Sequence, residues 1–136
     1  MQLYVNRDRA KTEATMELIR NLGCYSALWV TVDTPVVGKR EADERIRTET
    51  AVKAGLGQGS GVFKGGLASQ ASGFLDQTLS WDDLPWLTKM AGGMPIILKG
   101  IQSVHDAVRA YDVGVKGICL SNHGGRQLDH AYVSSS

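Results

Sequence analysis

The chain has 136 residues, of which 43% are hydrophobic and 21% charged, and its formal net charge is +1. This length suits one ordinary domain, and the near-neutral charge gives no electrostatic support for binding nucleic acid or an anionic membrane. No apolar run is long enough to cross a bilayer, and the first residues lack the pattern of a signal peptide. Cys24 and Cys119 show neither CxxC nor Cys/His spacing, so we expect two reduced thiols and no metal site.

The N-terminal residues predict a strand followed by a helix. Residues 2–5 form a short apolar-rich run, and Asn6 or Asp8 is placed to cap the helix that comes next. An apolar residue recurs every four positions, with Ile19 beside the stripe, which is typical of one buried helix face. The stripe consists of Ala10, Ala14, Leu18 and Leu22. Gly23 stands where a glycine commonly ends a helix.

A second strand and a long insert come next. Residues 27–32 are apolar and β-branched without alternation, which favours a strand buried on both faces, as in a parallel sheet. Residues 36–79 are too many for an ordinary strand-to-helix loop. Within them, residues 41–53 favour a helix, whereas the Gly, Ser and Gln content of residues 55–73 indicates a mobile segment. Such an insert often forms a lid or a substrate loop; a surface insertion without function is the alternative.

Two more helices and two more strands are expected after the insert. Ser80 and Asp83 resemble a capping box, and Gly92-Gly93 ends the helix that they begin. Its buried stripe would be Leu84, Leu87 and Ala91. Residues 95–98 predict a short buried strand, residues 103–113 a helix ended by Gly114, and residues 117–120 a further strand. The apolar positions at helical spacing in the last helix are Val104, Ala107, Val108 and Tyr111.

Alternating strands and helices of this size indicate an α/β fold with a parallel sheet and outer helices. A closed (β/α)8 TIM barrel has eight strands and typically about 250 residues. The chain supplies about four parallel strands, so residues 1–136 are predicted to be an internal part of one barrel domain.

Polar side chains occur at the end of each predicted strand, where the strands of a parallel barrel converge on one mouth. They are Gln2 and Tyr4, then Thr31 and Asp33, then Lys99, and finally His123 and Arg126. Each has an ordinary structural explanation when it is taken alone, but four successive strands delivering such groups favour an active site. A histidine beside a carboxylate is a general base, an arginine binds a carboxylate in bidentate fashion, and a lysine stabilises developing negative charge.

Together these groups suit the oxidation of a carboxylic acid at its α-carbon. No side chain accepts an electron pair, so this chemistry requires a redox cofactor. A glycine-rich GxGxxG motif after a strand is absent from the sequence, which leaves a Rossmann-type NAD site without support.

The ordered motifs resemble the FMN-dependent 2-hydroxy-acid oxidases and dehydrogenases, a family that includes glycolate oxidase, lactate oxidase and the flavocytochrome lactate dehydrogenase. The motifs that carry the resemblance are Gln2-Leu3-Tyr4, Thr31-Val32-Asp33-Thr34-Pro35, Gly38-Lys39-Arg40-Glu41, Trp81-Asp82-Asp83-Leu84, Leu98-Lys99-Gly100-Ile101-Gln102 and Ser121-Asn122-His123-Gly124-Gly125-Arg126-Gln127-Leu128-Asp129. The last motif is the most specific, and the likeness covers the chain up to about Asp129.

The resemblance implies a catalytic and substrate-binding role for five residues. His123 would be the base that takes a proton from the substrate, and Asp33 would stabilise its protonated form. Arg126 would bind the substrate carboxylate, Arg40 would support it as a nearby charge, and Tyr4 would hydrogen-bond the substrate oxygen. Whether the base takes the α-proton or the hydroxyl proton is left open by the sequence.

The resemblance also implies an FMN site. Gln2, Thr31 and Lys99 would contact the flavin ring, with Lys99 at the edge where negative charge develops. The family's FMN phosphate-binding segments have no counterpart in these residues, so an alternative is that the 136 residues alone are an inactive fragment. About half a barrel would expose two unpaired sheet edges and an open apolar interior, and the resulting instability favours this alternative.

Other expectations follow from the same resemblance. The electron acceptor, whether oxygen, cytochrome c or a quinone, the choice of 2-hydroxy acid and the cellular compartment all stay open, and the full-length form is expected to be a homo-oligomer. An inosine-monophosphate dehydrogenase relative or an aldolase is a weaker alternative. Inosine-monophosphate dehydrogenase relatives use a catalytic cysteine, whereas Cys119 lies inside a predicted strand, and the Ser-Asn-His-Gly-Gly-Arg motif does not belong to them.

Overall fold

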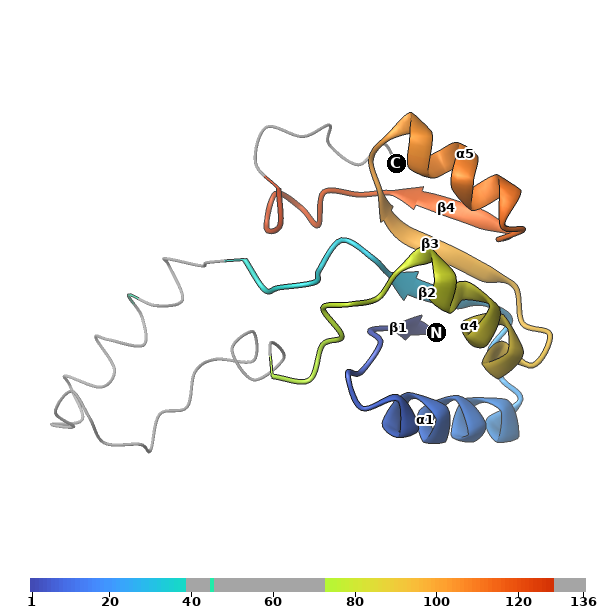
Figure 1. Ribbon diagram of the computed structural model, residues 1–136. Helices are drawn as coiled ribbons and strands as arrows, with labels where there is room; N and C mark the ends of the chain where they lie inside the picture. Colours follow the sequence, from blue (N-terminus) through green and yellow to red (C-terminus); the bar gives the residue numbers. More distant parts are fainter. Residues whose placement is uncertain (39–44, 46–72, 129–136) are drawn as a thin grey trace, which may run out of the picture.

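The structure is a computed structural model that describes residues 1–38, 45 and 73–128. In this part of the chain, four strands form one parallel sheet whose spatial order follows the sequence (Figure 1). They are β1 (Gln2–Leu3), β2 (Leu28–Thr31), β3 (Ile96–Ile101) and β4 (Gly117–Leu120). Successive parallel strands with helical connections are the repeating unit of a barrel. The predicted partial α/β barrel is confirmed.

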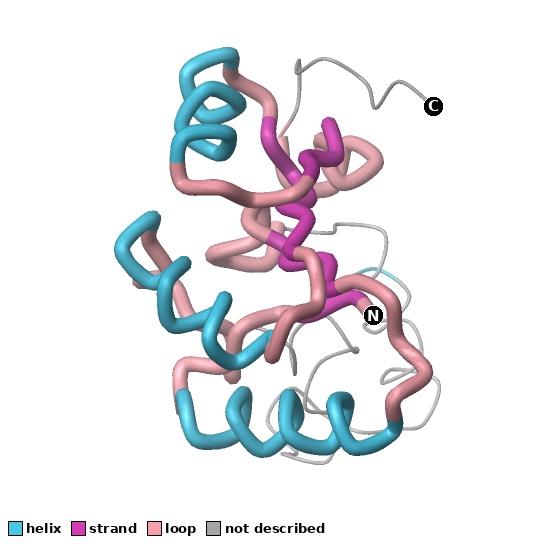
Figure 2. Tube along the Cα trace, turned by 90° about the vertical axis from the view of Figure 1, so that its right-hand side faces the viewer, coloured by secondary structure: helices cyan, strands magenta, loops and turns pink. Residues whose placement is uncertain are grey.

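Helices α1 (Arg9–Leu22), α4 (Leu84–Ala91) and α5 (Val104–Asp112) lie along one side of this sheet (Figure 2). A short 3-10 turn, η1 (Trp81–Asp83), precedes α4, and the capping box that Ser80 forms with Asp83 begins it. Gly23 and Gly92 end α1 and α4 in the left-handed conformation, as their positions predicted.

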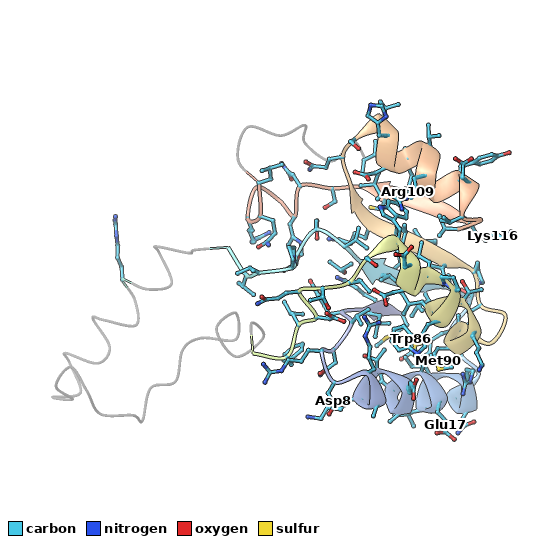
Figure 3. The ribbon with its side chains drawn as sticks, viewed as in Figure 1. Asp8, Glu17, Trp86, Met90, Arg109 and Lys116 are labelled. Atoms are coloured by element: carbon cyan, nitrogen blue, oxygen red, sulfur yellow. The ribbon has the colours of Figure 1, made fainter. Side chains whose placement is uncertain are left out.

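The core lies between the helices and the sheet face that they cover. Leu28 and Val30 of β2 and Leu98 of β3 are almost fully buried there. The predicted face of α4 is confirmed, since Leu84, Leu87 and Ala91 are all buried. Figure 3 shows Trp86 and Met90 on the side of α4 that faces α1. The Trp86 indole donates a hydrogen bond of 3.0 Å to Glu13, and Arg20 donates one of 2.6 Å to the Met90 carbonyl.

The predicted apolar faces of α1 and α5 are wrong. Leu18 and Leu22 are 59% and 57% exposed, Ala10 and Ala14 are exposed too, and α1 instead buries Thr12, Met16 and Ile19. In α5, Val104, Val108 and Tyr111 are exposed, whereas Ala110 is buried and Ala107 packs against the core. Helical spacing identifies an apolar stripe, but the neighbouring elements decide which face is covered, and the described sheet and α4 cover a different one.

Strand β2 also differs from the expectation of burial on both faces, because Trp29 is 38% exposed. Side chains alternate along a strand, so Trp29 and its neighbour Thr31 lie on the sheet face away from the helices. The expected helix and mobile segment of the insert lie outside the described residues, apart from Arg45. Among the described helices, none combines the length and the apolar character that crossing a membrane requires.

Candidate active site

His123 and Asp33 meet at the carboxyl ends of β4 and β2, although 90 positions separate them in the sequence. The Nδ1 atom of His123 is 2.9 Å from Oδ1 of Asp33, and their side chains are only 16% and 9% exposed. Both strands are parallel and end on the same side of the sheet, which is why the two loops come together (Figure 1). Because a carboxylate only accepts hydrogen bonds, this contact favours a proton on Nδ1 and an unprotonated Nε2.

Tyr4 and Thr34 complete the surroundings of the imidazole. The Tyr4 hydroxyl lies 3.4 Å from Nε2 of His123, on the side away from Asp33. Thr34 donates its hydroxyl proton to Oδ1 of Asp33 over 3.0 Å and lies 3.1 Å from Nδ1 of His123. The two ring nitrogens of His123 therefore have different neighbours, a carboxylate and a threonine on one and a phenol on the other.

A tight turn after β4 presents His123 to Asp33. His123 has a φ of 62°, a left-handed backbone conformation that residues other than glycine adopt at a cost of about 1–3 kcal/mol. The buried Ser121 accepts a hydrogen bond from the His123 N–H at 3.0 Å, and the buried Asn122 accepts one from the Gly125 N–H at 3.1 Å. Gly124 and Gly125 continue the turn with φ values of 65° and 72°, which explains the two glycines of the motif.

Gly100 makes room for Asp33. It interrupts the register of β3 with β4 between Lys99 and Ile101, and its φ is 109°. A Cβ atom on Gly100 would collide with the side chain of Asp33. The other carboxylate oxygen of Asp33, Oδ2, lies 3.9 Å from Nζ of Lys99, whose side chain is 20% exposed.

Three predicted cofactor-binding residues lie in one row across the sheet face away from the helices. Thr31 of β2 and Lys99 of β3 are register partners, so their side chains point to the same face. The Gln2 side chain from β1 donates a hydrogen bond of 3.0 Å to the Thr31 hydroxyl. The row presents an ammonium, a hydroxyl and an amide to the same space.

The structure places the predicted arginines less directly. Arg126 lies in the His123 turn, is exposed, and donates through Nη1 to the His123 carbonyl at 3.3 Å. It is therefore adjacent to the imidazole in the chain, but its guanidinium contacts the backbone. Arg40 lies outside the described residues.

Two residues of the site were not identified from the sequence. Thr34 stood within a recognised motif without a role of its own, although its hydroxyl contacts both Asp33 and His123. Gly100 stood within a recognised motif, but nothing in the sequence indicated that it faces Asp33. The signal that was available is the position of a threonine and a glycine directly beside predicted site residues.

A separate ion-pair cluster fixes the chain next to Tyr4. Arg9 forms ion pairs with Asp76 at 2.7 Å and Asp83 at 3.1 Å, and its guanidinium lies 4.5 Å from the Trp86 ring centroid. Burial alone would raise the pKa of the Asp76 carboxyl, but hydrogen bonds from Thr78 and the charge of Arg9 hold that pKa below its ordinary value. The backbone of residues 74–76 also pairs with residues 5–7, through bonds of 2.8 and 2.9 Å.

Comparison with known proteins gives consistent matches over the whole chain. Residues 1–136 match the model of the FMN-dependent dehydrogenase family. The chain is 43% identical over 131 residues to an L-lactate dehydrogenase (cytochrome) of Saccharomyces cerevisiae, a match that covers 94% of this chain and 22% of that protein. It is 41% identical over 143 residues to an L-lactate oxidase of Nostoc, with 98% of this chain and 38% of the relative covered.

Solved structures agree with these matches. The recombinant flavin-binding domain of baker's yeast flavocytochrome b2 superposes with a TM-score of 0.75 at 40% identity, over 96% of this chain and 28% of that one. A mandelate oxidase variant with (S)-mandelic acid gives a TM-score of 0.68 at 32% identity, over 96% and 34% of the two chains. The chain thus spans between about a fifth and two fifths of the length of the curated relatives described above.

Proposed function

Since the chain belongs to the family of FMN-dependent dehydrogenases, we propose that it carries the proton-transfer site of an enzyme that oxidises a small 2-hydroxy acid to the 2-oxo acid. The observation that carries this proposal is the 2.9 Å contact between Nδ1 of His123 and Asp33, which leaves Nε2 facing the Tyr4 hydroxyl. The relatives are named for L-lactate, and a solved neighbour for mandelic acid, all of which are 2-hydroxy acids.

The row of Gln2, Thr31 and Lys99 fits a flavin. The pyrimidine edge of FMN alternates hydrogen-bond acceptors and donors, and this row offers a cation, a hydroxyl and an amide that can serve both. When bound, FMN would accept the electron pair that no protein side chain can take. Lys99 would lie at the edge where negative charge accumulates, because a fixed cation stabilises such charge most where water is excluded.

The substrate would lie between Tyr4 and His123. Its hydroxyl oxygen would meet the Tyr4 phenol, and Nε2 of His123 would accept a proton from the substrate. Asp33 would hold the imidazole in the required tautomer through Nδ1 and stabilise the imidazolium that forms. Both the α-hydrogen and the hydroxyl hydrogen are lost overall, and two electrons leave with them.

We further propose that Arg126 and Arg40 bind the substrate carboxylate. Arg126 is exposed beside the His123 turn, and rotation about its side-chain bonds exchanges a 3.3 Å contact with a carbonyl for a charged partner. A bidentate pair between guanidinium and carboxylate is stronger than a hydrogen bond to a neutral carbonyl. The homo-oligomeric state stays a prediction, and oxygen, cytochrome c and a quinone stay open as electron acceptors.

The test is reduction of the flavin by substrate. Anaerobic mixing of the complete flavin-loaded protein, in which the remaining barrel strands are present, with L-lactate or glycolate is expected to bleach the flavin absorbance. His123→Gln is expected to slow this step by about 10²–10⁴-fold while flavin stays bound, because the general base is lost. His105→Gln is the matched control, since His105 is an exposed residue of α5. Unchanged reduction in His123→Gln would refute the proposal.

A second proposal concerns the 136 residues taken alone, which we expect to be inactive. The described sheet has two unpaired edges, β1 and β4, and large apolar side chains such as Trp29, Ile118 and Leu120 are exposed on it. A flavin-loaded and active preparation of these residues alone would refute this second proposal and leave the first intact.

A further inference from the structure

Two buried polar atoms close to the His123–Asp33 pair have no hydrogen-bond partner among the described residues. They are Oδ2 of Asp33, an acceptor, and Nε2 of Gln102, a donor. The Asp33 side chain is only 9% exposed, so bulk water does not reach Oδ2, and Nζ of Lys99 at 3.9 Å is too distant for a hydrogen bond. A buried polar atom left unpaired costs about 1–3 kcal/mol, and such atoms in folded proteins nearly always have a partner.

Both residues line one groove, which has a volume of about 620 Å³. Gly100, Ser121 and Asn122 also line this groove, so polar atoms border the part of it that adjoins Asp33. Gln102 lies two positions after Gly100 in the sequence, and Gly100 packs against the Asp33 side chain. A space of this size, with an unpaired acceptor and an unpaired donor on its walls, has room for an ordered water molecule that bonds to both.

We propose that Gln102 is a positioning residue that donates its side-chain N–H, through a bridging water molecule in this groove, to Oδ2 of Asp33. Pairing Oδ2 in this way leaves Oδ1 directed at Nδ1 of His123. It also draws part of the carboxylate charge away from the imidazole. Gln102 thereby tunes how strongly Asp33 favours the protonated form of His123. The consequence for the reaction rests on the proposed function, but the hydrogen bond itself does not.

Other charged and titratable groups around the pair are identified by the structure. Lys99 faces Oδ2 from β3 at 3.9 Å, and Tyr4 faces Nε2 from the chain after β1. Arg126 contacts the His123 carbonyl, and Asp106 of α5 lines the groove while it accepts a hydrogen bond from Ser103 at 2.7 Å. A change at Gln102 leaves these groups in place, so its effect on the pair is separable from theirs.

The test uses the flavin-loaded protein with Gln102→Leu, Gln102→Glu and, as a matched control, Gln77→Leu at an exposed position. The first measurement is the proton NMR resonance of the His123 Nδ1–H, which needs no turnover. Loss of the donor to Oδ2 strengthens the bond from Nδ1–H to Oδ1, so Gln102→Leu is expected to move this resonance downfield.

The second measurement is the pH dependence of flavin reduction by L-lactate. The base works when it is neutral, and removing the donor favours its protonated form. The acid limb of the profile is therefore expected to move to higher pH by about 0.5–1 unit in Gln102→Leu and further in Gln102→Glu. Gln77→Leu is expected to change neither measurement.

The outcomes separate the two proposals. A shifted resonance without any flavin reduction in the parent protein would leave the role of Gln102 standing and refute the proposed function. Normal reduction by the parent protein, with the resonance and the acid limb both unmoved in Gln102→Leu and Gln102→Glu, would overturn the role of Gln102. A fall in rate or stability without a shift in the resonance or the acid limb would also overturn the role of Gln102, because altered packing would explain such a fall.

Discussion

At the scale of single residues, the site depends on backbone conformations as much as on its ionisable side chains. His123 adopts a left-handed conformation that Ser121 and Asn122 hold in place. Gly100 adopts another, with φ of 109°, and its missing Cβ is the space that Asp33 occupies. Strain of this kind persists where surrounding contacts over-determine it, and it concentrates at functional sites.

Gly100→Ala is expected to lower the free energy of unfolding and to displace Asp33 from His123. The positive φ costs about 1–2 kcal/mol, and the collision adds about 1–3 kcal/mol. Gly93→Ala is the matched control, because Gly93 has φ of 94° but no atom within 4 Å of the position that an alanine Cβ would take. Urea unfolding of both variants measures the difference, and equal losses in the two would contradict the packing of Gly100 against Asp33.

The sequence predicted that His123 and Asp33 would lie together, and the structure brings them into contact, but the other groups that touch them were not predicted. His123 and Asp33 follow strands of a parallel sheet, and the ends of such strands converge by geometry alone. The bridging hydroxyl of Thr34 depends on a side-chain direction that no spacing encodes. The same holds for Gln102, since its burial follows from how the chain turns after the irregularity at Gly100.

At the scale of elements, the end of the insert is fastened to the connection between β1 and α1. Residues 74–76 exchange backbone hydrogen bonds with residues 5–7, and Arg9 joins Asp76 to Asp83 at the start of η1. Tyr4 lies directly before this fastened segment, so the ion pairs fix the chain that presents its hydroxyl to His123.

Asp76→Asn tests the contribution of these contacts through the pH dependence of the unfolding free energy. The folded protein lowers the pKa of Asp76 below its ordinary value of 3.8, so the ionised carboxylate stabilises the fold above that value. At neutral pH the variant is expected to lose about 1–3 kcal/mol of unfolding free energy, since a buried charged hydrogen-bond partner is removed.

The difference in unfolding free energy between the parent protein and Asp76→Asn, called the gap below, is expected to stay constant from pH 7 to 5. It should narrow as the pH falls through the lowered pKa of the folded state, because the parent then loses the same charge. Urea unfolding at several pH values measures the gap. Asp82→Asn, at an exposed carboxylate in η1, is the control. A gap that is unchanged down to pH 3 would contradict the account.

Helix positions and helix ends were predicted better than helix faces. Gly23, Ser80 and Gly92 mark helix boundaries, because capping depends on the type of residue at the helix end, which can be read from the sequence. The stripe with Leu18 and Leu22 did not predict the buried face of α1, because burial depends on which element packs against the helix.

At the scale of the whole molecule, the four-stranded sheet has two chemically different faces. The helix side is an apolar core, and the opposite side carries the row of Gln2, Thr31 and Lys99 together with the exposed Trp29. Since the four described strands are parallel, their carboxyl ends bring His123 and Asp33 to one edge of the face that carries this row. The topology itself therefore brings together the imidazole of His123, the carboxylate of Asp33 and the row of Gln2, Thr31 and Lys99, and this is why alternating strands and helices sufficed to predict where these groups meet.

The most direct test of this account is the rate of anaerobic flavin reduction by L-lactate in Asp33→Asn. An amide presents its N–H to Nδ1 of His123 as readily as its oxygen, so the imidazole loses the partner that fixes its tautomer. We expect a rate lower by about 10²–10⁴-fold with flavin still bound, and an unchanged rate in Asp112→Asn, at an exposed carboxylate at the end of α5. A rate in Asp33→Asn equal to that of the parent protein would contradict the claim that Asp33 orients His123 as the base.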